Sequence, residues 1–147
     1  MPTTTATATA PSRLSALAVP TFAPVAHAVL RIGAGLLFMQ HGAQKLFGFL
    51  GGVDGNGATV ELLSQFGLAG VLEFFGGALV VLGLFTRPVA AVLTALMVAA
   101  YSIAHAFQAV FPVQNGGELA LLYALVFAFL AAAGPGAWSL DGRRRTR

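Results

Sequence analysis

The sequence predicts an all-α membrane protein, a four-transmembrane-helix bundle with both termini in the cytoplasm. Hydrophobic residues make up 57% of the 147 residues and charged residues only 9%, which leaves too few polar side chains to cover the outer faces of a soluble bundle. Four long apolar segments follow one another, each close to the roughly 20 residues that a helix needs to cross a bilayer. The basic residues outside these segments all fall on one side of the path that four spans would take.

The chain divides into two tails and a membrane domain. Residues 1–24 are rich in Thr, Ala and Pro without apolar periodicity, and we expect a flexible tail there. A cleaved signal peptide is the less favoured alternative, because Pro20 and Pro24 interrupt its apolar core. The transmembrane domain covers residues 25–138, and its predicted helices are about 25–49, 68–85, 88–110 and 119–137. The Gly-Pro-Gly run at 134–136 should end the regular part of the fourth helix, and 139–147 is expected to be a basic tail.

Charges in the loops predict the orientation. The two tails and the turn after the second span carry the basic residues Arg13, Arg87, Arg143, Arg144, Arg145 and Arg147. The charged residues of the two remaining loops are all acidic: Asp54, Glu61 and Glu118. The positive-inside rule therefore places both termini in the cytoplasm. In the first outer loop, residues 59–66 are equally consistent with a short helix on the membrane surface and with a plain loop.

Polar side chains within the spans gather near the outer end of the predicted bundle. Counting about 1.5 Å of rise per residue, the candidate polar site consists of His41, Lys45, Glu73, His105, Asn115 and Glu118. A lone carboxylate inside a bilayer is costly, so Glu73 is expected to have a partner. Lys45 is the simplest partner, because it lies at a similar depth on the preceding helix. His41 or His105 is expected to hydrogen-bond to this pair.

Structural interpretations of the same residues stay open. Lys45 can extend to the outer interface instead of pairing. Glu118 can simply favour the N-terminus of the fourth helix. His105 can be a hydrogen-bonded histidine without a function, and Arg31 can extend to the inner surface in the same way as Lys45.

Several classes of function are excluded or disfavoured. The chain has no cysteine, which rules out disulfides, thiol chemistry and cysteine-ligated iron–sulfur clusters. No metal site is predicted. The run GGVDGNG follows no predicted strand, so it is not a dinucleotide-binding loop, and a flavin or nicotinamide would have to reside on a partner protein. The basic residues concentrate in a tail rather than on a face, so nucleic acid is not an expected partner.

Four segments of the chain match a known pattern. They read LRIGAGLLFMQHGAQKLFGF, LEFFGGALVVLGLFTR, QNGGELALLY and GPGAWSLD. In this order and at these spacings, over about residues 26–142, the chain resembles the DoxX family of small bacterial membrane proteins. The resemblance implies four transmembrane helices and a set of signature residues: Arg31, His41, Gly42, Lys45, Glu73, Gly76, Gly77, Arg87, Asn115 and Glu118. It also implies an association with quinone-linked oxidation and with defence against oxidative stress.

The leading functional hypothesis is a membrane subunit of a redox or oxidative-stress-related system. A quinone is the candidate cofactor, because its headgroup needs hydrogen-bond donors and acceptors such as His41, Lys45, Glu73 and His105. Besides the lipid bilayer, a protein partner or a second copy of the chain is expected. The alternatives are a structural or assembly protein without chemistry, a haem-binding electron carrier that uses His41 and His105 as axial ligands, and a small transporter. The sequence assigns no catalytic residue and leaves open whether the protein is an enzyme.

Overall fold

The computed structural model describes residues 22–145, and the regular secondary structure in this range is helical. The elements in chain order are α1 (Ala23–Phe47), the 3-10 turn η2 (Phe49–Gly51), α2 (Gln65–Val71), the π-helical turn η3 (Leu72–Gly76), α3 (Gly77–Leu82), α4 (Thr86–Ala104), α5 (Pro112–Asn115), α6 (Glu118–Ala133) and α7 (Leu140–Arg145). Because α2, η3 and α3 follow one another without a break, they form one helix of 18 residues, Gln65–Leu82. The chain is therefore built on four long helices.

Three of these helices, α1, Gln65–Leu82 and α4, are long and apolar enough to cross a membrane, whereas α6 is apolar but shorter. Many large apolar side chains point outward, for example Leu37 at 54% exposed and Leu125 at 70% exposed. Exposed apolar faces on every long helix are unfavourable in water and favourable in lipid. An all-helical membrane bundle is therefore confirmed, while the number of spans and the side on which the termini lie stay predictions.

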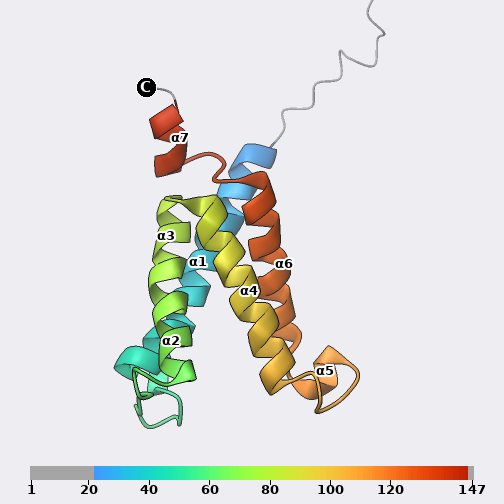
Figure 1. Cartoon of the computed structure of the whole chain (residues 1–147). Coiled ribbons are helices and arrows are strands. Elements are labelled where there is room, and N and C mark those ends of the chain that lie inside the picture. The colour runs from blue at the N-terminus through green and yellow to red at the C-terminus, as the bar shows by residue number, and fades with distance from the viewer. Residues whose placement is uncertain (1–21, 146–147) are drawn as a thin grey trace, which may run out of the picture.

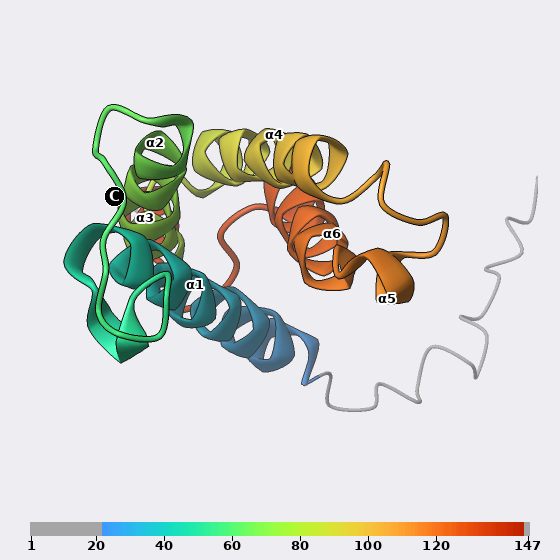
Figure 2. The same cartoon turned by 90° about the horizontal axis from the view of Figure 1, so that it is seen from below.

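The helices run alternately up and down (Figure 1). The start of α1 and the short helix α7 lie at one end of the bundle, which we call the terminal end. The loop between α1 and α2 and the short helix α5 lie at the opposite end, the loop end. Seen from the loop end, α1 packs mainly on α2, η3 and α3, and α4 packs mainly on α6 (Figure 2). The fold is thus two helix pairs joined by a short turn at the terminal end.

The core lies where the two pairs meet. Phe38 of α1 is 1% exposed, and its ring centroid is 4.9 Å from that of Tyr123 and 4.8 Å from that of Phe127, both on α6. The buried core residues come from four elements: Phe38, Val80, Ala90, Leu93, Met97, Tyr123, Ala124, Phe127 and Leu130. These tilted and edge-on aromatic contacts fix α6 against α1, where direct backbone approach is sparse.

Local sequence explains where the helices begin and end. The Ser64 hydroxyl accepts the Gly67 N–H at 3.0 Å and so caps the start of α2. At the end of α1, Gly48 adopts a left-handed conformation with φ of 68°, which glycine tolerates without strain. The helix α6 ends at Ala133, as the following Gly-Pro-Gly run predicts.

Several expected boundaries differ from the structure; the second helix, for example, is Gln65–Leu82 rather than about 68–85. The third helix ends at Ala104 rather than near residue 110, because the N–H of Ala106 bonds to the carbonyl of Tyr101, five residues back, and so breaks the α-helical pattern of bonds four residues back. Residues 59–64 form no helix, so this part of the first loop is a plain loop. Within the expected basic tail 139–147, residues Leu140–Arg145 form the short helix α7, which the sequence analysis did not predict. The predicted flexible tail and signal peptide fall mainly on residues 1–21, outside the described range.

Candidate functional site

Close packing of two helices at the loop end depends on a glycine. A Cβ atom added to Gly42 of α1 would lie 2.5 Å from the backbone nitrogen of Phe74 and 2.7 Å from the carbonyl oxygen of Gly70. No side chain fits at such distances, so the backbone of α1 rests directly on α2 and η3. Gly42 thus sets the separation of the helices that carry Lys45 and Glu73.

The adjacent glycines Gly76 and Gly77 serve two different interfaces. A Cβ atom on Gly77 would lie 2.9 Å from the carbonyl oxygen of Gly35 and 2.7 Å from Cγ of Met39, both on α1. A Cβ atom on Gly76 would instead lie 2.8 Å from Cδ2 of Leu93 on α4. Because neither glycine has a side chain, the helix Gln65–Leu82 can pack closely against both α1 and α4 in the turn that follows Glu73.

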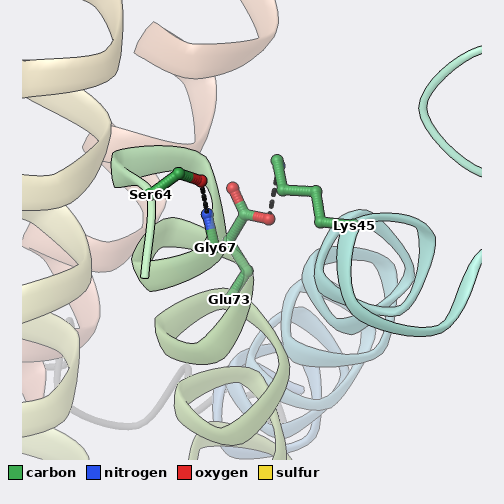
Figure 3. Close-up of polar contacts among 4 residues, drawn as sticks. All are labelled: Lys45, Ser64, Gly67 and Glu73. Carbon is green, nitrogen blue, oxygen red and sulfur yellow. Dashed lines mark hydrogen bonds and ion pairs between the residues drawn. The ribbon is translucent and has the colours of Figure 1, made fainter. Parts of the chain in front are cut away.

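The predicted ion pair is present at this contact. Nζ of Lys45 lies 2.5 Å from Oε2 of Glu73, and the two side chains point toward each other across the helix contact (Figure 3). The Glu73 side chain is 6% exposed and that of Lys45 is 21% exposed. Glu73 belongs to η3, and π-helical turns within α-helices are frequent at functional sites. Lys45 therefore pairs with Glu73 rather than extending away to the interface.

His41 and Tyr123 complete what we call the ion-pair site: His41, Lys45, Glu73 and Tyr123. The ring of His41 lies edge-on to that of Tyr123, with centroids 5.9 Å apart. Within residues 22–145, neither side chain makes a hydrogen bond, and Oε1 of Glu73 accepts none. The site therefore combines one charged pair with several polar atoms whose hydrogen-bonding capacity the described protein groups do not use.

The sequence analysis did not select Tyr123. A signal was available, because Tyr123 is the single residue with a hydroxyl group in the apolar helix α6. The hydroxyl of a buried tyrosine usually needs a hydrogen-bond partner. Its position on α6 brings that helix to the ion-pair site, which the sequence analysis assembled mainly from the first three helices.

His105 and Asn115 belong to a second group, which we call the His105 cluster together with Tyr101. Nδ1 of His105 lies 2.8 Å from the carbonyl oxygen of Asn115. The Asn115 amide donates to the carbonyl of Ala109 at 3.0 Å and to the Tyr101 hydroxyl at 3.2 Å, and its oxygen accepts the Gly117 N–H at 2.8 Å. These bonds fold the connection from α4 to α6. His105 therefore bonds to the connection, and the expectation that His41 or His105 hydrogen-bonds to the Lys45–Glu73 pair is not met among the described residues.

Glu118 lies apart from both groups. It is the first residue of α6, its side chain is exposed, and it accepts no hydrogen bond from the described residues. A carboxylate in the first turn interacts favourably with the helix dipole. Of the six residues in the predicted polar site, the structure therefore brings together His41, Lys45 and Glu73, joins His105 to Asn115, and leaves Glu118 at a helix start.

At the terminal end, Arg31 is completely buried. Its guanidinium donates to the carbonyls of Val80 and Val81 at 2.6 Å each, and to those of Ala137 and Trp138 at 3.2 and 2.9 Å. These acceptors lie at the end of α3 and in the segment after α6, and the Val80 carbonyl also accepts the Gly83 N–H at 3.1 Å. Of the alternatives left open for Arg31, extension to the inner surface does not fit the structure, because the backbone of two other segments surrounds its guanidinium.

Arg87 plays a similar part for α6. Its guanidinium donates to the carbonyls of Ala131, Ala132 and Ala133 at 3.1, 2.7 and 3.4 Å. These are the last carbonyls of the helix, where a cation is favoured by the helix dipole. The two signature arginines thus stabilise the C-terminal ends of two helices.

Hydrogen bonds of Asp141 connect α7 to the turn between α3 and α4, a role that the sequence analysis did not predict. Its carboxylate accepts the N–H groups of Phe85 at 3.0 Å and Thr86 at 2.9 Å, and its own N–H donates to the carbonyl of Gly83 at 3.0 Å. Partial burial tends to raise the pKa of Asp141, but these hydrogen bonds outweigh burial and hold the pKa below its usual value. The only sequence signal was its place in the closing GPGAWSLD motif. We call Arg31, Arg87 and Asp141 the terminal network.

Among the described residues 22–145, no group of three or more His, Asp or Glu side chains is arranged to hold a metal ion. The side chains of the ion-pair site can donate and accept hydrogen bonds, carry charge and exchange protons.

Comparison with known proteins places the chain in a family. Residues 26–106 match the DoxX family model. An uncharacterized protein of Haemophilus influenzae is 40% identical over 126 residues, which cover 83% of this chain and 92% of that protein. Inner membrane protein YphA of Escherichia coli is 34% identical over 128 residues, which cover 82% and 91%. No solved structure matches the chain significantly. With its apolar helices, the chain is a multi-pass inner-membrane protein that belongs to the DoxX family.

Proposed function

We propose that the chain is a membrane subunit of a redox or oxidative-stress-related system, and that its ion-pair site receives the headgroup of a quinone. The observation that carries this proposal is the unused hydrogen-bonding capacity of His41, Tyr123 and Glu73 beside a charged pair. A quinone carbonyl needs a donor, and the Lys45 ammonium offers one, because it has three N–H groups and donates to Glu73 alone among the described residues. Any electrons would come from a protein partner.

An apolar groove supports this proposal. It has a volume of about 510 Å³ and is lined by Leu36, Met39, Gln40, Ala43, Phe49, Leu50 and Phe74. Gln40 and Phe74 directly neighbour His41 and Glu73 in the sequence, so the groove lies on the same turns of helix as the ion-pair site. Its volume falls in the range of small-molecule sites, which are about 300–1,000 Å³. Apolar walls suit the tail of a quinone.

The proposal is tested with the full chain purified in mild detergent and titrated with decylubiquinone, with thermal unfolding and retained quinone as readouts. We expect the quinone to stabilise the native protein, and His41→Ala and the double variant K45M/E73Q to lose this stabilisation. His105→Ala is the matched control, because that histidine belongs to the other cluster and should keep quinone binding. Equal binding by native protein and K45M/E73Q would disprove the proposal.

The structural alternative applies best to the His105 cluster, where bonds go mainly to backbone groups of a loop. For haem, the absorption spectrum is the discriminating measurement. We expect no Soret band in the purified protein, and a band that disappears in both His41→Ala and His105→Ala would favour an electron carrier instead.

We further propose that α6 is a fourth span and that the terminal end faces the cytoplasm. The helix has 16 residues, about 24 Å at 1.5 Å per residue, but it lies along α4, which is long enough to span. The terminal end carries Arg87, Arg143 and Arg144, whereas the loop end carries acidic loop residues. Single cysteines at Thr3, Asn56 and Thr146 test this with an impermeant thiol reagent on intact cells. Only Asn56→Cys should be labelled.

A further inference from the structure

We propose that the terminal end binds one anionic phospholipid, with its phosphate at Arg87 and Arg144 and an acyl chain in the groove between α3 and α4. The phosphate would occupy a hollow of about 310 Å³ lined by Phe85, Arg87, Pro88, Pro135, Asp141 and Arg144. This site lies at the opposite end of the bundle from the ion-pair site and does not depend on the proposed quinone.

The charge of the hollow favours an anion. Arg87 is exposed and donates only to neutral carbonyls, so no carboxylate neutralises it among the described residues. Arg144 lies over the ring of Phe85, with Cζ 5.8 Å from the centroid. Asp141 offsets one of these two positive charges, while its own oxygens are turned to the N–H groups of Phe85 and Thr86. The remaining balance of one positive charge matches the single negative charge of a phosphodiester.

A second hollow continues the first into the membrane. This groove, also about 310 Å³, is almost entirely apolar and is lined by Val71, Leu72, Phe75, Gly76, Leu79, Pro88, Val89, Val92 and Leu93. Pro88 lines both the charged hollow and the groove, so the two adjoin each other at the first turn of α4. The residues that line the groove come from the helix Gln65–Leu82 and from α4.

The combination points to a lipid rather than to a free anion. Phe75 and Val92, on opposite walls of the groove, are 56% and 50% exposed, so the groove is open to the surrounding acyl chains. A soluble phosphate would gain nothing from the apolar groove. Basic pockets beside transmembrane helices are the usual recognition elements for anionic headgroups.

The test uses the full chain in detergent, and thermal unfolding is followed while phosphatidylglycerol, phosphatidylcholine or inorganic phosphate is added. Phosphatidylglycerol should stabilise the protein, and the other two should not. Arg144→Gln should weaken this effect about fivefold, the factor expected for one basic residue near an anionic lipid. Val92→Trp fills the groove without changing charge and should weaken it by at least a similar factor.

Two matched controls separate a built site from general attraction. Val98 is on the same helix as Val92, is almost equally exposed at 49% and does not line the groove; Val98→Trp should bind as the native protein does. Arg143 lines neighbouring hollows instead, and Arg143→Gln should also leave binding unchanged. Equal stabilisation by phosphatidylcholine or inorganic phosphate, equal loss in R143Q and R144Q, or equal loss in V92W and V98W would each overturn the proposal.

Discussion

The two ends of the bundle use charged residues in opposite ways. At the terminal end, Arg31 and Arg87 donate to backbone carbonyls, and Asp141 accepts from backbone N–H groups. At the loop end, the charged pair Lys45–Glu73 is made between side chains. The terminal network therefore provides hydrogen-bond partners for backbone groups at helix ends, which every helical fold must provide. The polar side chains of the ion-pair site bond to no backbone group of the described residues, so the helices do not need them for this purpose.

This contrast separates signature residues that maintain the fold from those available for function. A cation buried among carbonyls has fixed partners, and any change in its position would disrupt helix ends. A side-chain pair with spare hydrogen-bonding atoms can exchange partners at little cost to the helices. Substitutions of Arg31 and Asp141 should therefore cost mainly stability, and those at the ion-pair site should separate stability from binding.

The largest effect is expected from Arg31→Met. The substitution removes a buried guanidinium, which leaves the carbonyl of Val81 without its donor and that of Val80 with only the Gly83 N–H. Charge-assisted hydrogen bonds and unsatisfied buried acceptors together predict a loss of about 4 kcal/mol in the free energy of unfolding. Thermal unfolding in detergent, followed by circular dichroism, measures it. Arg31→Lys should recover only part of the loss, because an ammonium cannot reach four carbonyls at once. A loss below about 1 kcal/mol would mean that the buried network contributes little.

The next effect concerns Lys45 and Glu73. Breaking a buried pair by removing one partner typically costs about 3–5 kcal/mol, and the partial exposure of Lys45 places Glu73→Gln and Lys45→Met near the lower limit. The double variant K45M/E73Q should recover much of the loss, because no unpaired charge remains. A double-mutant cycle on thermal stability measures this coupling. Simple additivity of the two single effects would show that the pair contributes no coupling energy.

The difference between the ends also explains what the sequence could predict. Lys45 and Glu73 lie within long helices, so counting residues from the helix ends placed them at one depth. The partners of Arg31 are carbonyls of α3 and of the segment after α6. Every residue has a backbone carbonyl, so the sequence does not indicate which of them accept a hydrogen bond. His105 was assigned to a continuous helix, but α4 ends one residue before it, which turns its ring toward Asn115. The π-helical turn that carries Glu73 has no sequence signature either.

A smaller effect is expected for Asp141, and it depends on pH. Because the folded-state pKa is lowered, the carboxylate contributes its full stability above the unfolded-state pKa of about 4. This stability is lost as the pH falls through the lower folded-state pKa. Asp141→Ala should cost about 1 kcal/mol at neutral pH, as for the loss of a helix cap. Asp141→Asn should flatten the acid limb of the stability–pH curve, measured by thermal unfolding from pH 7 to pH 3. An unchanged acid limb would contradict this assignment.

The smallest effect is expected for Glu118, which tests where the loop-end site stops. The residue begins α6, is exposed, and contacts the helix only through the favourable field of its N-terminus. Glu118→Gln should therefore cost about 0.5 kcal/mol, and less at high salt, because exposed dipole interactions are weak and screened. Stability at two salt concentrations and decylubiquinone binding are measured on the same samples. Unchanged binding would confine the site to the groups around Lys45 and Glu73. Lost binding with intact stability would instead extend the site to the start of α6. In that case charged residues across the whole loop end, and not only Lys45 and Glu73, would serve binding.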